Sequence, residues 1–341
     1  MNRRDFLTTT GLVTATTVMS ACGSSNSAIA ETTQTKPTGA VSLYYEFKVA
    51  GPELASLLSN VKAQATALDA KAGFLSLSLK QMLGDSTMVN NFLPDLKGIL
   101  KSAYIDAAMK GRRPFVYTLF IRFDSYDNLV ASGAKEWFVK TIEPQLFAYD
   151  PSTTPPTKTK LALDYYQGIY KTIAGGDANG VYTTQADIIN FLKNQKDIAN
   201  TQYQTIPTDG TTSGASISVE NHVSIDASNT QTVNSKATAL LTVAQETYQP
   251  SSNPSDGTAG MLSNSNYQKA LSTEILQNAY ISQSDNSRDY LFHGVWKSVA
   301  DHENSHMDER FMKAANPVGA YVVAGPWEPF YQTMIVHNNP A

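Results

Sequence analysis

The chain has 341 residues, of which 42% are apolar and 16% are charged, and its formal net charge is −4. This length and apolar content are ample for a sizeable core and allow two domains. A slightly acidic chain has no general electrostatic footprint for nucleic acid, so we expect no nucleic-acid partner.

The first 22 residues predict export. The letters NRRDFL at residues 2–7 resemble the twin-arginine signal, and the apolar run at residues 11–21 is too short and too polar to remain as a membrane span. The letters VMSAC at residues 18–22 resemble a lipoprotein box, in which Cys22 is lipidated after cleavage. The sequence therefore predicts export by the twin-arginine route, with a lipid anchor in a membrane and a periplasmic or cell-surface location.

Cys22 is the only cysteine of the chain. An intramolecular disulfide, a cysteine-ligated metal and a cysteine nucleophile are therefore excluded. The second interpretation of Cys22 is an unmodified residue that is lost with the signal peptide. Residues 23–39 are polar and rich in Thr, Ser and Pro, which is typical of a flexible tether.

The rest of the chain repeats one pattern twice. Five segments in each half are matched: the four strand-like ones predict strands, and the one with helical period predicts a helix. The matched pairs are 39–49 with 214–225, 52–70 with 233–248, 73–82 with 260–269, 117–125 with 290–298, and 164–173 with 329–338.

This order is the split β-α-β plan of ferredoxin-like units. We predict an α+β fold in which two tandem ferredoxin-like units form an intrachain dimeric α/β barrel, with the helices outside. The first unit spans residues 40–173, a linker spans 174–213, and the second unit spans 214–341.

The register of the repeat indicates which unit is active. Phe123 and Trp296 occupy equivalent positions, and ten residues later the first unit has Gly133 where the second has His306. On the first strand, Tyr45 aligns with Asn221. Because the repeat keeps core positions and changes polar ones, we expect the second unit to carry the site and the first to be degenerate scaffolding.

The second unit resembles the antibiotic-biosynthesis-monooxygenase superfamily of dimeric α/β barrels, and within it the haem-degrading monooxygenases. The residues that carry the resemblance are Asn221 in the letters ENH, Trp296 at the end of the third strand, and His306 ten residues beyond it. The resemblance implies that His306 ligates haem iron, that Asn221 donates a hydrogen bond near the other face of the iron, and that Trp296 presses on the porphyrin.

The same three residues also suit catalysis without a cofactor. In that version the ligand is a quinol-like aromatic, the deprotonated substrate reacts with oxygen, and His306 is the base. We expect a small planar or aromatic ligand in either case, and an oligomer is possible. The competing class is a barrel that binds a ligand or partner and catalyses nothing.

Two further interpretations rest on short motifs. His302, Glu303 and His306 fit the H-E-x-x-H pattern of zinc proteases, but no third ligand follows at a usual spacing. Dye-decolourising-type haem peroxidases share the export route and the two-unit plan, but their Gly-x-x-Asp-Gly motif is not evident.

Alternation along a strand limits which side chains converge. Asn221 and His222 must point to opposite faces, as must His293 and Trp296. If Asn221 faces the barrel interior, His222 faces the helices. The histidines of the second unit therefore cannot all reach one metal ion unless the strands contain bulges.

Overall fold

The computed structural model describes residues 35–85, 98–100, 102–150, 157–160, 167–200, 214–247, 270–305 and 309–340. The export signal, Cys22 and His306 lie outside these residues, so what the sequence predicts for them stays a prediction. Among the described residues, no helix combines the length and the apolar character that crossing a membrane requires.

The elements follow the two-unit order. The strands of the first unit are β1 (Val41–Ala50), β2 (Phe74–Asp85), β3 (Gly98–Ile99), β4 (Pro114–Phe123), β5 (Phe147–Asp150), β6 (Thr157–Lys160) and β7 (Gln167–Asp177), which runs into the linker, where β8 (Gly180–Tyr182) follows. Its helices and turns are η2 (Gly51–Glu53), α1 (Leu54–Leu68), α2 (Ser102–Met109), α3 (Tyr126–Ser132), α4 (Ala134–Trp137), η4 (Phe138–Ile142) and η5 (Glu143–Gln145). The joining segment contains α5 (Gln185–Lys193). The second unit contains β9 (Ile217–Asp226), η6 (Ala227–Asn229), α6 (Thr230–Thr247), β10 (Ser272–Asn278), β11 (Ser287–Trp296), α7 (Val299–Ser305), α8 (Glu309–Gly319), β12 (Val322–Trp327) and β13 (Pro329–Asn338).

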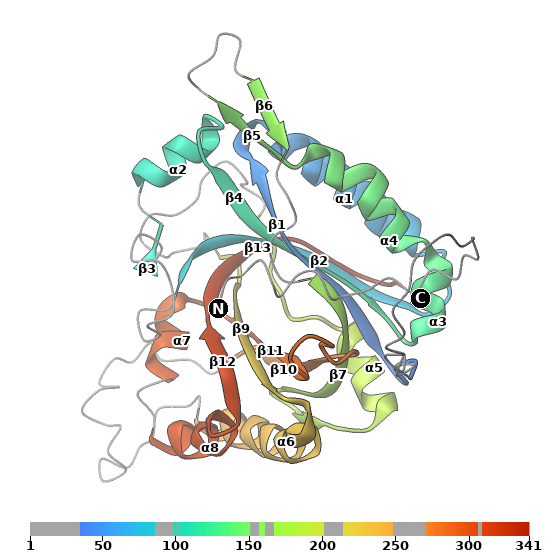
Figure 1. The fold of residues 1–341 in the computed structure, drawn as a ribbon, viewed down its shortest axis with the longest axis vertical. Helices are drawn as coiled ribbons and strands as arrows, with labels where there is room; N and C mark the ends of the chain where they lie inside the picture. Colours follow the sequence, from blue (N-terminus) through green and yellow to red (C-terminus); the bar gives the residue numbers. More distant parts are fainter. Residues whose placement is uncertain are drawn as a thin grey trace, which may run out of the picture.

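Eight of the described strands close into an antiparallel barrel (Figure 1). Their order is β1-β4-β2-β13-β9-β11-β10-β7, and β7 returns to pair with β1. Each unit has its four strands in the ferredoxin-like order, and the units join along two seams, β2 with β13 and β7 with β10. The predicted α+β fold of two tandem ferredoxin-like units in one intrachain barrel is confirmed.

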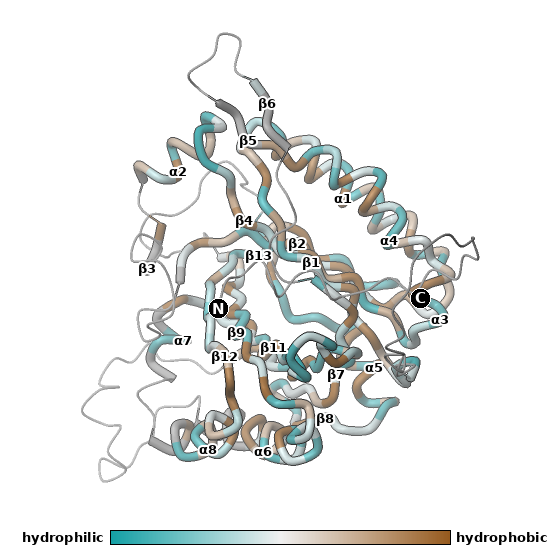
Figure 2. The backbone as a smooth tube through the Cα atoms, in the orientation of Figure 1, coloured by the Kyte–Doolittle hydropathy of each residue, from teal (hydrophilic) through white to brown (hydrophobic). Residues whose placement is uncertain are grey.

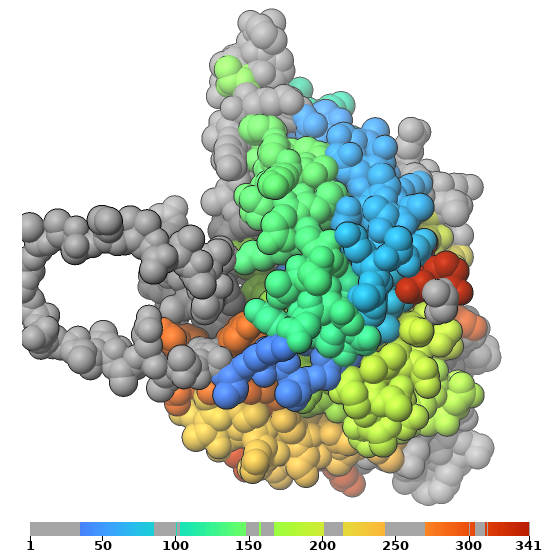
Figure 3. All heavy atoms as spheres, turned by 90° about the vertical axis from the view of Figure 1, so that its right-hand side faces the viewer, coloured from blue at the N-terminus to red at the C-terminus, as the bar shows by residue number. Residues whose placement is uncertain are grey.

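The outer face of the barrel is apolar and is covered by helices. In β1 the residues Val41, Leu43, Tyr45, Phe47 and Val49 alternate with inward polar ones and join the largest core cluster. Figure 3 shows α1 and α3–α4, in blue and green, lying side by side above α5 and α6. Hydropathy alternates along α1 as expected for a helix with one buried stripe (Figure 2).

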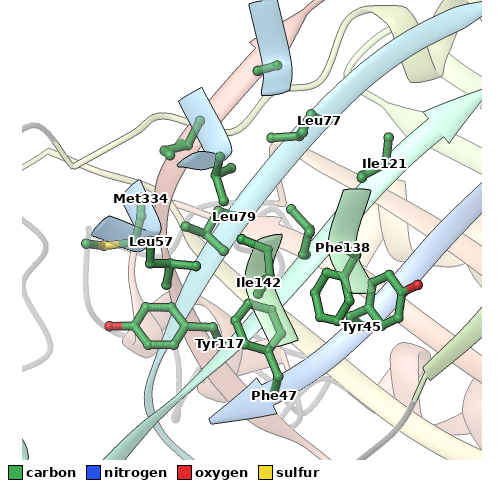
Figure 4. Packing of buried hydrophobic residues seen from close by; sticks show 14 of the residues in the cluster. Tyr45, Phe47, Leu57, Leu77, Leu79, Tyr117, Ile121, Phe138, Ile142 and Met334 are labelled. Atoms are coloured by element: carbon green, nitrogen blue, oxygen red, sulfur yellow. The ribbon is translucent and has the colours of Figure 1, made fainter. Parts of the chain in front are cut away.

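The first-unit part of this core is built from large side chains of strands and helices together (Figure 4). Tyr45 stacks on Phe138 with ring centroids 3.6 Å apart, and Leu57 of α1 packs into the same cluster. Burying one such side chain contributes about 1.5–3 kcal/mol, which fixes the helices on the outer face.

One predicted repeat element has a different position. The segment 260–269 was matched with strand 73–82, but it lies outside the described residues, and β10 occupies the place of the second strand in the second unit. The prediction was wrong because it relied on a shared Gly-apolar-Leu-Ser opening. In β10 the inward positions are Glu274 and Leu276, so its alternation of polar and apolar residues is weak.

Candidate functional site

Asn221 lies on the outer face of β9, under the helix layer. Glu220 and His222, its neighbours, point into the barrel, where both contact Tyr44 of the first unit. Asn221 and His222 point to opposite faces, as predicted, and it is His222 that faces the barrel interior. The other outward residues of β9 are Ile217, Val219, Val223 and Ile225, so Asn221 is the polar member of an apolar register.

Glu328 is the immediate partner of Asn221. The amide Nδ2 of Asn221 donates to Oε2 of Glu328 over 2.8 Å, and Glu328 is 2% exposed. Glu328 lies between β12 and β13, in the letters PWEPF, and sequence reasoning gave it no role. The available signal was a single acid inside an aromatic and proline-rich stretch.

His302 brings Glu328 and Trp296 together. Its Nε2 lies 3.0 Å from Oε1 of Glu328, and its ring meets the Trp296 indole edge-on at 5.2 Å. Ser298 sets the start of α7, because its Oγ accepts from the backbone N–H of Asp301 and donates to the Asp301 carboxylate. That cap places His302 one turn into the helix, facing the sheet.

Trp296 ends β11 on the same outer face, opposite Ile217 in the register. It is 2% exposed and belongs to the core cluster that also contains Phe330. Two of the three predicted site residues, Asn221 and Trp296, are therefore linked through Glu328 and His302. We call Asn221, Trp296, His302 and Glu328 the outer-face site.

A histidine held by a buried carboxylate is a common acid–base arrangement. The carboxylate orients the imidazole and stabilises its charged form, as in catalytic triads. Here Asn221 fixes the second oxygen of that carboxylate, and Trp296 supplies an aromatic wall. The site can take a proton from a ligand that reaches His302, and half-buried Asn221 marks its most open side.

A porphyrin does not fit the described residues of this site. The face of Trp296 that would carry a planar group is next to the His302 ring, and His302 also meets Phe330 at 5.4 Å. A separate question is a metal ion held by side chains alone: the described residues contain no group of three or more His, Cys, Asp or Glu that could hold one.

The barrel interior holds a second polar system, made by both units together. Glu220 accepts from the Tyr44 hydroxyl and from the Thr118 hydroxyl, each over 2.8 Å. His222 Nε2 lies 3.7 Å from the Glu46 carboxylate. In the register that aligns Tyr45 with Asn221, Tyr44 corresponds to Glu220 and Glu46 to His222. Each of these two contacts therefore joins a position of the first unit to the equivalent position of the second unit. Because the two side chains of each contact are different and complementary, neither unit could be replaced by a copy of the other without losing these contacts.

Buried ion pairs occupy the neighbouring part of the interior. Arg122 contacts the Glu274 carboxylate at 2.5 Å, and the same oxygen lies 2.9 Å from Nδ1 of His293. Lys80 contacts His293 and also Asp197, a linker residue whose side chain enters the barrel. These groups come from both units and the linker, so the network ties the three parts together.

Burial and charge pairing shift the pKa values of these interior groups, some upward and some downward. Burial raises the pKa of Glu220 to about 7 and lowers the pKa of His293 to about 4. Burial acts to raise the pKa of Glu274 as well, but the Arg122 charge outweighs it and holds that pKa at about 2. Glu274 is therefore an anion at neutral pH, while Glu220 is close to its titration midpoint.

Glu220 is expected to make stability fall as the pH rises. Its pKa is 4.5 in a model peptide and about 7 when folded, so between these values the folded chain holds a proton that the unfolded chain releases. The free energy of unfolding should therefore fall by about 3 kcal/mol between pH 4.5 and pH 7. Urea unfolding of the parent and Glu220→Gln at pH 5 and pH 8 measures it. Relative to the parent, the variant should be more stable at pH 8 than at pH 5. If the difference in unfolding free energy between variant and parent is the same at both pH values, the raised pKa of Glu220 is contradicted.

Two protein-family models match different parts of the chain. Residues 40–128 match the ABM-like domain, and residues 173–334 match the CT0912-like C-terminal domain. None of the curated proteins matches this chain significantly.

Solved structures with similar folds are distant in sequence. A "putative monooxygenase" from Fusobacterium nucleatum is 11% identical with a TM-score of 0.47, and covers 88% of this chain and 95% of its own. One from Lactobacillus acidophilus is 8% identical with a TM-score of 0.46, covering 89% and 97%. An anthrone oxidase-like protein is 11% identical with a TM-score of 0.46, covering 89% and 95%. At such distances the function has to be argued from the chain's own residues.

Proposed function

We propose that the chain is an exported, lipid-anchored, monooxygenase-like enzyme that oxidises a quinol-like aromatic without haem. The observation that carries the proposal is the contact of His302 with both Glu328 and Trp296. His302 with Glu328 provides a base, and Trp296 provides an aromatic wall beside it. A phenolic substrate needs both to bind and lose its proton in an apolar setting.

The reaction balances without a separate reductant. His302 takes the phenol proton, and the electron-rich phenolate reduces dioxygen and forms a carbon–oxygen bond at a ring carbon that carries hydrogen. Loss of water then leaves a quinone. One phenol and one dioxygen give one quinone and one water, so the substrate is oxidised by four electrons and both oxygen atoms are accounted for.

Oxygen uptake by the purified chain tests the proposal. A panel of naphthols and anthracenols with a free ring position is supplied in air, and quinone formation is followed by absorbance. We expect one oxygen consumed per quinone formed. Tight binding of the aromatic with no oxygen uptake would instead assign the chain to the non-catalytic binding class.

A haemin titration separates the haem version from this one. We expect no Soret shift, since the His302 ring packs against Trp296 and Phe330 in the outer-face site. A Soret shift that disappears in His306→Ala would overturn the proposal and restore His306 as the iron ligand that the resemblance implies.

Lipid attachment is tested at Cys22. In cells fed a labelled fatty acid, the parent should carry label and fractionate with membranes, whereas Cys22→Ser should lose the label. The Ser20→Ala variant keeps the cysteine and serves as the control. Equal membrane fractions for the parent and Cys22→Ser would contradict the lipid anchor.

A further inference from the structure

Four polar atoms on the inner wall of the barrel are buried and have no hydrogen-bond partner among the described residues. They are Ser42 Oγ, Arg122 Nε, Thr172 Oγ1 and Glu274 Oε2. All four residues are at most 2% exposed. None of them belongs to the outer-face site.

These atoms come from neighbouring strands, in the order β4-β1-β7-β10. Ser42 is directly opposite Arg122 in the register, and on its other side it is opposite Tyr170, two residues before Thr172. Glu274 reaches the cluster through its ion pair with Arg122. All four side chains point inward, because they share the alternation of Tyr44, Phe120, Tyr170 and Leu276, which pack together inside the barrel.

Buried polar groups in folded proteins are almost always paired with protein or with an ordered molecule, because each unpaired group keeps its full desolvation cost. Four such groups in one patch therefore indicate a bound molecule. Arg122 Nε can only donate, Glu274 Oε2 can only accept at neutral pH, and the two hydroxyls can do either.

We infer that this patch binds one small, neutral, hydroxylic molecule, such as water or hydrogen peroxide. The molecule accepts from Arg122 and donates to Glu274, and the hydroxyls of Ser42 and Thr172 complete its hydrogen bonds. A neutral ligand fits because Arg122 and Glu274 balance each other's charge. A small ligand fits because a cluster of buried aromatic and leucine side chains packs beside the patch. A molecule with several polar partners is the usual occupant of such a site.

Removal of each hydroxyl tests the inference by thermal unfolding of the full chain. Ser42→Ala and Thr172→Val should each lower the Tm by about 2–4 °C, because each removes a hydrogen bond to the bound molecule. The double variant should lose less than the two losses combined, since both hydroxyls hold one molecule. Thr118→Val, whose hydroxyl has Glu220 as its own partner, should add independently to Ser42→Ala.

An unchanged or higher Tm in both single variants would overturn the inference, because a hydroxyl that binds nothing is better removed. A high-resolution crystal structure gives a second, independent readout. A single round density peak among the four atoms identifies water, and an elongated peak after a peroxide soak identifies the larger molecule. Absence of density, with both hydroxyls turned onto backbone carbonyls, would also overturn it.

Discussion

Replacing Arg122 by methionine is expected to lower the free energy of unfolding by about 3–5 kcal/mol, because it leaves the Glu274 carboxylate charged and buried without its cation. Arg122 is fully buried, and Glu274 keeps only His293 as a close partner. Urea unfolding at pH 7 measures the effect. It should be among the largest for a single residue, since the pair joins the two halves across the barrel.

Two further variants define the origin of that loss. Lys36 pairs with Asp127 on the surface, where both side chains are more than half exposed, so Lys36→Met should cost less than about 1 kcal/mol. Combining Arg122→Met with Glu274→Leu should recover much of the stability, because the stranded charge is then gone. If Arg122→Met and Lys36→Met lower the free energy of unfolding equally, burial of the Arg122–Glu274 pair does not add to its contribution to stability.

Replacing His302 by alanine is expected to reduce kcat for aromatic oxidation by about 10²- to 10⁴-fold, the usual contribution of a positioned general base. Glu328→Gln should also reduce kcat, since it removes the negative charge beside the imidazole. Steady-state oxygen uptake with the best substrate of the panel measures both effects.

His337 offers a matched control on the same domain. Its Nε2 lies 2.7 Å from the Asp69 carboxylate, so it is also a histidine–carboxylate pair, but both side chains are partly exposed and neither belongs to the outer-face site. His337→Ala should keep the parent's kcat. If both alanine variants retain full activity, the outer-face site is not where the proton is taken.

Part of the candidate site could be predicted from the sequence. The repeat register singled out Asn221 and Trp296, and both lie on the outer face of the second unit. The outward direction of Asn221 was also readable, because it interrupts the apolar series Ile217, Val219, Val223 and Ile225. Glu328 was not predictable, because it lies more than 100 residues from Asn221 and meets it only through the pairing of β12 and β13 with β9.

The polar residues inside the barrel could also be predicted only in part. The alternation of β1 and β9 indicates that Glu46, Glu220 and His222 share a polar face, but such a face is usually solvated. The closed barrel buries it instead, and the partners Tyr44 and Thr118 come from the other unit. The resulting shift of the Glu220 pKa depends on that burial.

The sequence by itself determined the two-unit plan, the alternation of each strand and the candidates in the second unit, because these depend on local periodicity and on repetition along the chain. The tertiary structure decided which face became the interior, which charges paired across the barrel, and that His302 and Glu328 meet beside Trp296. The physical reason is the pair of seams, β2 with β13 and β7 with β10. They bring together segments far apart in sequence and exclude water between them, and burial then sets both the pairing and the pKa of the groups enclosed.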